Sequence, residues 1–128
     1  MNLTKNEIEV MDVFWEAEQP LSRSELLEKS VDNSWKPNSV HILLNSLLKK
    51  GALREAGFTR SGKTYGRTFA PMVTCEQYHA STVFTTTRNK PDAAAFLEAL
   101  LNTTDTEFTV EDLDRMVEVI NKKREAQG

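Results

Sequence analysis

The chain has 128 residues, of which 39% are apolar, 27% charged and 8% aromatic, and its formal net charge is −3. This length fits one domain, or a small domain with an oligomerisation segment, and the composition excludes a collagen-like or wholly disordered chain. The sequence has no apolar run of the roughly 18–20 residues needed to cross a bilayer, and its first residues lack the pattern of a signal peptide. We therefore expect a cytoplasmic protein without membrane insertion. The lone Cys75 excludes an internal disulfide and a cysteine-rich zinc site, and no cofactor is predicted.

The first two predicted helices each begin with a capping box. Thr4 and Glu7 form the first T-x-x-E pattern, and Pro20 limits the helix that follows. Ser22 and Glu25 repeat the pattern at the start of a shorter second helix. The apolar residues predicted to face the core are Ile8, Val10, Met11, Phe14 and Trp15 in the first helix and Leu26, Leu27 and Val31 in the second.

A third helix and a hairpin follow. Pro37 is predicted as the first residue of the helix and Gly51 as its C-cap. Two short strands, 52–55 and 64–69, surround a glycine-containing loop at 57–63. Three short helices followed by a hairpin are typical of a winged helix-turn-helix, with the hairpin as the wing. The apolar residues at helical spacing in the third helix are Val40, Leu43, Leu44, Leu47 and Leu48.

The rest of the chain is predicted to be helical, over 75–88, after Pro91 and after Thr109, which caps the last helix. Residues 72–128 are too few to bury the apolar faces of these helices, so they either fold back on the first domain or pair with a second copy. We favour pairing. The residues predicted to form the homodimer contact are Phe84, Phe96, Leu97, Leu100, Leu101, Leu113, Met116, Val117 and Ile120.

The predicted fold class is therefore mainly α with a small β-hairpin wing. It consists of a winged helix-turn-helix DNA-binding domain at 1–71 and a helical dimerisation domain at 72–128.

Charge is unevenly distributed along the chain. Residues 1–35 contain three Lys or Arg against eight Asp or Glu, and residues 71–128 contain six against ten. Residues 36–70 contain seven basic residues against Glu55 alone. A basic block within an acidic chain is typical of a surface that binds a polyanion, although a merely solvated stretch is an equal alternative by itself.

The candidate DNA contacts are the exposed side of the third helix and the basic residues around it. Asn45 can make two hydrogen bonds to adenine, Ile42 can pack on a thymine methyl, and Lys49 can bind a phosphate. Plain solvent exposure is an equal alternative for Asn45 and Ser46, and Lys49 could serve only the helix dipole. The predicted DNA-binding residues are Ser22, Arg23, Ser24, Lys36, Asn38, Ser39, His41, Ile42, Asn45, Ser46, Lys49, Arg60, Lys63 and Arg67.

Nearly the whole chain resembles the penicillinase repressor family of bacterial regulators, the BlaI, MecI and CopY group. The segments that carry the resemblance are LTKNEIEVMDVFWE, LSRSELLE, WKPNSVHILLNSLLKKGAL, YGRTFAP and FTVEDLDRMVEVINKK. The resemblance implies a homodimeric repressor that binds a palindromic double-stranded DNA operator. It also implies that the winged domain reads DNA and that the C-terminal helices hold the dimer together.

The chain departs from the family pattern in three places. Asn38, Ile42 and Ser46 stand where the recognition helix of such repressors usually has Lys, Thr and Arg, so the operator need not be the same. The Asn-Phe bond that is cut in the β-lactam-responsive members is absent around residues 100–104. The paired C-x-C motifs of the copper-responsive members are also absent, which excludes copper sensing by that route. The inducing signal and any action of a sensor protease are left open.

No catalytic spacing is present. His41 and His79 lie far apart outside any metal-binding motif, and Cys75 has no activating motif, although its place at a helix start slightly favours a lowered pKa. We therefore predict that the protein is not an enzyme. The alternative function is a winged-helix protein-interaction module without specific DNA binding, because the third helix carries little charge.

Overall fold

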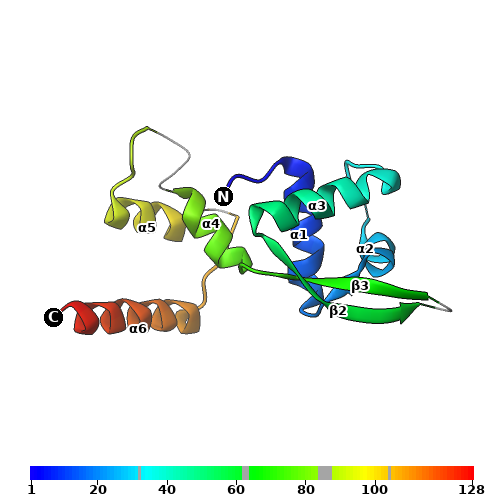
Figure 1. Cartoon of the computed structure of the whole chain (residues 1–128). Coiled ribbons are helices and arrows are strands. Elements are labelled where there is room, and N and C mark those ends of the chain that lie inside the picture. Colours follow the sequence, from blue (N-terminus) through cyan, green and yellow to red (C-terminus); the bar gives the residue numbers. More distant parts are fainter. Residues whose placement is uncertain (32, 62–63, 84–87, 104) are drawn as a thin grey trace. The chain divides into compact units, whose positions relative to one another are not determined.

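The structure is a computed structural model that describes residues 1–31, 33–61, 64–83, 88–103 and 105–128; at residues 60, 61, 64 and 65 it describes the backbone alone. These residues form six α-helices and a small antiparallel sheet, which confirms the predicted fold class (Figure 1). In chain order the elements are α1 (Lys5–Ala17), β1 (Leu21–Ser22), α2 (Arg23–Lys29), the 3₁₀ turn η1 (Pro37–Ser39), α3 (Val40–Lys50), β2 (Leu53–Ser61), β3 (Thr64–Pro71), α4 (Cys75–Val83), α5 (Ala93–Leu101) and α6 (Val110–Gln127).

The predicted capping boxes are present at the starts of α1 and α2. The Glu7 N–H donates to Thr4 Oγ1 at 3.2 Å, and the Thr4 N–H donates to Glu7 Oε1 at 2.8 Å. Ser22 and Glu25 make the same reciprocal pair at the start of α2. Each pair satisfies backbone donors that the first helical turn leaves without a partner. Local sequence therefore sets where both helices begin.

The ends of α3 agree in part with the prediction. Gly51 is the C-cap in a left-handed conformation with φ 80°, which a glycine adopts without strain. Pro37 begins the 3₁₀ turn η1, and the α-helix itself starts at Val40. Helical structure therefore begins at Pro37 as predicted, but its first turn is a 3₁₀ turn, and the α-helix begins three residues later.

The hairpin is longer than predicted. Residues 57–61, which we expected in the loop, belong to β2 and pair with β3. The pairing continues because a bulge lies between Glu55, opposite Phe69, and Gly57, opposite Thr68, so one additional residue is absorbed without ending the ladder. Gly57 has φ 147°, a conformation open to glycine. The two strands form a long wing that extends beyond α2 and α3 (Figure 1).

Strand β1 was not predicted. Leu21 pairs with Phe69 and Ser22 with Thr68, and the strand order in the sheet is β1-β3-β2. Two residues are too few for an alternating pattern to be visible in the sequence. This short strand joins the start of α2 to the base of the wing.

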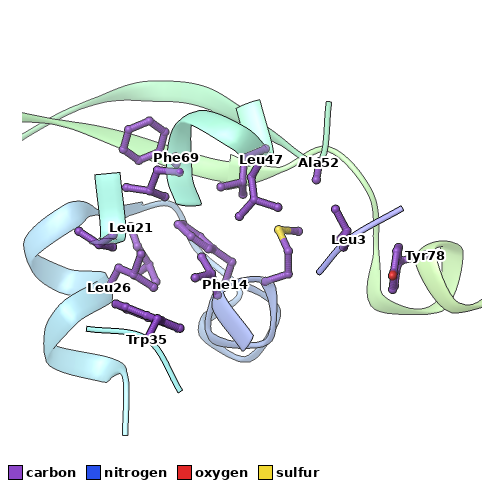
Figure 2. Close-up of a cluster of buried hydrophobic side chains, with 14 residues drawn as sticks. Leu3, Phe14, Leu21, Leu26, Trp35, Leu47, Ala52, Phe69 and Tyr78 are labelled. Atoms are coloured by element: carbon purple, nitrogen blue, oxygen red, sulfur yellow. The ribbon is translucent and has the colours of Figure 1, made fainter. Parts of the chain in front are cut away.

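The core lies between α1, α2, α3 and the base of the sheet. Phe14 is 1% exposed, and Figure 2 shows Leu21, Leu26 and Trp35 on one side of it and Tyr78 at the far end of the cluster. The prediction that Val31 belongs to the apolar face of the second helix is wrong. Helix α2 ends at Lys29, and Val31 is 79% exposed in the segment that follows.

Helix α4 packs with the winged part of the chain. Tyr78 is buried in the core cluster, its ring centre lies 6.1 Å from that of Trp15, and Trp15 Nε1 donates to the Val73 carbonyl at 2.9 Å. The described chain divides into two units, Met1–Arg88 and Asn89–Gly128. The boundary predicted from the sequence lies between residues 71 and 72, before α4. The difference arises because the apolar contact of Tyr78 could not be seen from the sequence.

A buried carboxylate connects α1 with the end of α3. Glu7 is 2% exposed; its Oε1 accepts from Lys50 Nζ at 2.6 Å, in addition to the capping bond, and its Oε2 accepts from Ser46 Oγ at 2.5 Å. Burial alone raises the pKa of Glu7, but the hydrogen bonds from Lys50, Ser46 and Thr4 outweigh this effect and lower the pKa to about 2. The charged form of Glu7 therefore stabilises the packing of α1 on α3.

The Glu7→Gln variant is expected to be less stable than the wild type by about 2–3 kcal/mol at pH 7, because a buried charge-assisted network loses its acceptor charge. The pKa of Glu7 in the folded protein lies below the ordinary value of 4.5. Its carboxylate therefore contributes fully to the free energy of unfolding above pH 4.5, and this contribution is lost as the pH falls through about 2. Urea unfolding at pH 7, 4 and 3 should therefore show the gap between wild type and variant shrinking with acid.

The matched control is Glu28→Gln, which removes a carboxylate from an exposed position of α2. Its free energy of unfolding should follow that of the wild type at each pH. A Glu7→Gln variant that unfolds like this control at pH 7 would contradict the assignment.

Candidate nucleic-acid interface

A groove lies between the start of α2, the exposed side of α3 and strand β3. Its volume is about 350 Å³. Three segments that are far apart in the sequence meet here, and each contributes predicted DNA-binding residues. The groove is lined by Ser22, Arg23, Ser24, His41, Leu44, Asn45, Gly66, Arg67 and Phe69.

Helix α3 has one buried and one exposed face. Val40, Leu44 and Leu47 are at most 3% exposed and pack into the core, because their spacing places them on the same side of the helix. The outward side carries a ridge at i, i+3 and i+7, formed by Ile42, Asn45 and Lys49. Ile42 is 62% exposed, a large exposure for an apolar side chain in the middle of a packed helix. The ridge therefore offers an apolar group, an amide and a cation to a partner.

The turn before α3 places three more predicted residues at the surface. Lys36 and Asn38 are exposed, and Ser39 is half-buried. Pro37 holds them in the 3₁₀ turn η1, where the Ser39 N–H donates to the Lys36 carbonyl at 2.9 Å. Lys36 and Asn38 therefore stand beside the start of α3 and are free of the core.

Two predicted hydroxyls are used inside the protein. Ser22 is buried, and its Oγ accepts from the Glu25 N–H at 3.2 Å. The Ser46 hydroxyl donates to the buried Glu7 carboxylate. Both residues are among the predicted DNA contacts, and in the structure each hydroxyl bonds within the protein, while Ser22 also lines the groove.

The base of the wing presents an arginine that is already paired. Arg67 Nη1 donates to Glu55 Oε1, and its guanidinium carbon lies 5.5 Å from the centre of the Phe69 ring. Phe58 lies directly opposite Arg67 across the hairpin and is 73% exposed. Neither Glu55 nor Phe58 is among the site residues predicted from the sequence. The position of Glu55 as the one acidic residue within the basic block could have drawn attention to it, whereas no sequence pattern marks Phe58.

Two predicted wing residues fall outside what the structure describes. The backbone of Arg60 belongs to β2 and pairs with Tyr65, while its side chain is not described. Lys63 lies outside the described residues, as does Phe84 of the predicted dimer contact.

The second unit leaves its apolar side chains uncovered. Neither α5 nor α6 has a buried residue. Phe96, Leu100, Leu113, Val117 and Ile120 of the predicted dimer contact are exposed, and Leu97, Leu101 and Met116 are half-buried. A groove of about 610 Å³ within this unit is lined mainly by apolar groups, among them Phe108 and Val119.

The described residues contain neither a cluster of three or more His, Cys, Asp or Glu side chains that could hold a metal ion nor a helix long and apolar enough to span a membrane. Burial raises the pKa of the Cys75 thiol, and the negative charges of Glu76 and Asp12 raise it further. The expectation of a slightly lowered pKa for Cys75 at the start of α4 is therefore wrong. Burial first, and then the two nearby carboxylates, favour the neutral thiol.

A helix with an exposed polar ridge, a capped helix before it and a β-hairpin after it define a winged helix-turn-helix protein. The chain belongs to the penicillinase repressor family, whose model matches residues 3–122. This is a family of transcriptional repressors. The family assignment rests on this sequence match.

Two solved structures are similar to the chain. The first is BlaI from Bacillus licheniformis, in its monomeric form in complex with the blaP half-operator; it is 26% identical, with a TM-score of 0.44, over 61% of this chain and 89% of that chain. The second is MarR from Staphylococcus aureus in complex with salicylate and kanamycin; it is 13% identical, with a TM-score of 0.41, over 98% of this chain and 73% of that chain. A comparison with curated protein sequences finds no match.

The raised pKa of Cys75 makes a testable prediction. The native protein should react with iodoacetamide several times more slowly at pH 8 than the same protein unfolded in urea, because less of the thiol is ionised. The midpoint of the pH–rate curve should also lie higher in the native protein. A native midpoint at or below the unfolded value would contradict the raised pKa.

Proposed function

We propose that the chain is a homodimeric transcriptional repressor that binds a palindromic operator through α3 and the wing. The observation that carries this proposal is the groove between α2, α3 and β3, which brings Arg23, Asn45 and Arg67 together from three segments beside the ridge of α3. Membership of a repressor family supports it.

Helix α3 is the element that enters the major groove in this proposal. The amide of Asn45 hydrogen-bonds an adenine edge, and Ile42, one turn closer to the start of the helix, packs on a thymine methyl. Lys49 at the end of the ridge and Lys36 before the helix bind phosphates on either side of the base contacts. The base contacts specify the sequence, and the phosphate contacts set the position of the helix on the duplex.

Arg23, Ser24 and Arg67 line the groove beside α3 and bind the backbone of the same half-site. Arg60 and Lys63 extend this contact along the wing toward an adjacent minor groove. The Ser22 hydroxyl caps the start of α2, and the Ser46 hydroxyl bonds to Glu7 and so holds α3 against α1.

The dimer is proposed from the second unit. Helix α6 is 18 residues long and exposes apolar side chains on several turns, and α5 contributes Phe96 and Leu100. Apolar patches of this kind are typical of protein–protein contacts. A second copy of the chain covers them symmetrically, and a two-fold dimer then requires a two-fold operator. Within the predicted dimerisation domain at 72–128, the proposed contact lies in Asn89–Gly128, because Tyr78 of α4 is buried in the core of the first unit.

One observation favours the alternative of a protein-interaction module. Ile42 and Phe58 are both more than 60% exposed, and exposed apolar groups suit a protein partner as well as DNA. The two functions differ in their response to salt. Binding to DNA releases counterions and weakens steeply as salt rises, whereas an apolar protein contact does not.

The DNA-binding proposal predicts that duplexes selected from a random pool by the full-length protein contain an inverted repeat. The half-sites should be centred about one helical turn apart, or a multiple of it. The affinity for the selected duplex should fall linearly on a log–log salt plot, by about 0.9 per phosphate neutralised. A pool that shows no enrichment, together with a flat salt response, would favour the interaction module.

Two substitutions on the ridge of α3 separate base from phosphate contacts. Asn45→Ala should weaken the selected duplex by about 5- to 30-fold and leave random duplexes almost unchanged. Lys49→Ala should weaken both kinds of duplex alike and reduce the salt slope by about one per protomer. Anisotropy titration measures both effects. Lys122→Ala, which removes a lysine from α6, is the control for net charge, and equal behaviour of Lys49→Ala and Lys122→Ala would contradict the docking of α3.

The dimer proposal predicts that Val117→Asp converts a dimer into a monomer in sedimentation velocity, because a carboxylate enters the apolar contact. The helix content by circular dichroism should be retained, since Val117 is 55% exposed within the chain itself. Glu118→Gln, at the adjacent exposed position of α6, is the matched control and should remain dimeric. A wild-type protein that sediments as a monomer, or a Val117→Asp variant that remains dimeric, would count against the contact.

A further inference from the structure

We propose that Glu55 is an electrostatic brake on DNA binding, which holds Arg67 and lowers the affinity of the wing for every DNA sequence alike. This inference rests on the proposed DNA-binding function. Glu55 is the sole acidic residue among residues 36–70, against seven basic ones. It stands at the base of the wing, in the segment where a negative charge opposes binding most directly.

Glu55 and Arg67 are in contact across the hairpin. The two residues lie on neighbouring strands, with Glu55 opposite Phe69 and Arg67 two residues before Phe69 along β3. Residues two apart on a strand share a face, so Glu55, Arg67 and Phe69 belong to one face of the sheet. The Arg67 guanidinium is paired with the Glu55 carboxylate and lies near the Phe69 ring.

A bulge in β2 lies directly after Glu55. It ends the regular register at Glu55, and the next paired residue is Gly57, opposite Thr68. Bulges redirect the side chains beside them and are frequent next to functional sites. Here the last side chain before the irregularity is the carboxylate that contacts the arginine.

Arg67 belongs to the proposed DNA-binding surface. It lines the same groove as Arg23, His41 and Asn45, and its side chain is 51% exposed, as that of Glu55 is 52% exposed. Both charges are therefore in contact with solvent and within reach of a phosphate that enters the groove. A phosphate there competes with the carboxylate for the guanidinium and is repelled by it.

The size of this effect follows from the separation of the charges. In bulk water a pair of unit charges about 4 Å apart changes a binding equilibrium by about fivefold. Near a protein surface the effective dielectric constant is lower than that of water, so the interaction is stronger. The brake acts on backbone contacts only, so it leaves the preference between sequences unchanged. A repressor with this brake binds non-specific DNA less tightly and keeps its base contacts.

The test is anisotropy titration of the full-length protein with the selected duplex and with a random duplex, from about 50 to 200 mM salt. Glu55→Gln should tighten both duplexes by the same factor, about 3- to 10-fold at the low end, and steepen the salt slope by about 0.9 per protomer because one more phosphate is neutralised. Glu55→Gln combined with Arg67→Ala should lose this gain. Glu28→Gln, the same charge change on α2, is the matched control and should leave the affinity within about twofold.

Each other outcome overturns the brake. Weaker binding of Glu55→Gln to both duplexes would show that Glu55 orients Arg67 for its phosphate. A change confined to the selected duplex would show that Glu55 reads a base, such as the amino group of cytosine. A gain in affinity equal to that of Glu28→Gln would show that Glu55 acts only through the net charge of the protein. If the wild type binds neither duplex, the proposed function fails and the brake fails with it, a result distinct from wild-type binding that Glu55→Gln leaves unchanged.

Discussion

The packing of the inner face of α3 against α1 is the contact on which the proposed DNA-binding surface depends. Val40, Leu44 and Leu47 must be covered by the core for the ridge of Ile42, Asn45 and Lys49 to face outward. Apolar burial supplies the affinity between the helices, but it is not directional. The carboxylate of Glu7 supplies the direction, because it accepts hydrogen bonds from two positions of the last turns of α3 and from the start of α1. A rotation of α3 about its axis would break these bonds and leave a buried charge without partners.

The helical part of this fold could be predicted because helix boundaries are encoded locally. Thr4, Ser22 and Thr109 each bond to a residue three positions later, so the signal and the structure occupy the same few residues. The buried face of α3 could be predicted for the same reason, since its apolar spacing repeats with the period of the helix. Burial in the structure confirms that side of the helix.

The features that escaped prediction all depend on partners far along the chain. Strand β1 exists because two residues before α2 meet the middle of β3. The Ser46 hydroxyl turns inward because Glu7, 39 residues earlier, is buried beside it. Helix α4 joins the first unit through Tyr78 and Trp15, although nothing in its own weakly amphipathic sequence indicates that contact. The position of Ser46 along its helix therefore does not reveal that its hydroxyl bonds within the fold.

The bulge between Glu55 and Gly57 has a consequence for how the protein behaves in a crowded cell. Strand β2 lies at an open border of the sheet, where unpaired amides and carbonyls can recruit a strand from another molecule. The bulge twists this edge strand and interrupts its row of hydrogen-bond donors and acceptors. This irregularity hinders edge-to-edge pairing between the wings of two molecules. The long hairpin can therefore remain extended with a lower tendency to pair with the wing of another copy.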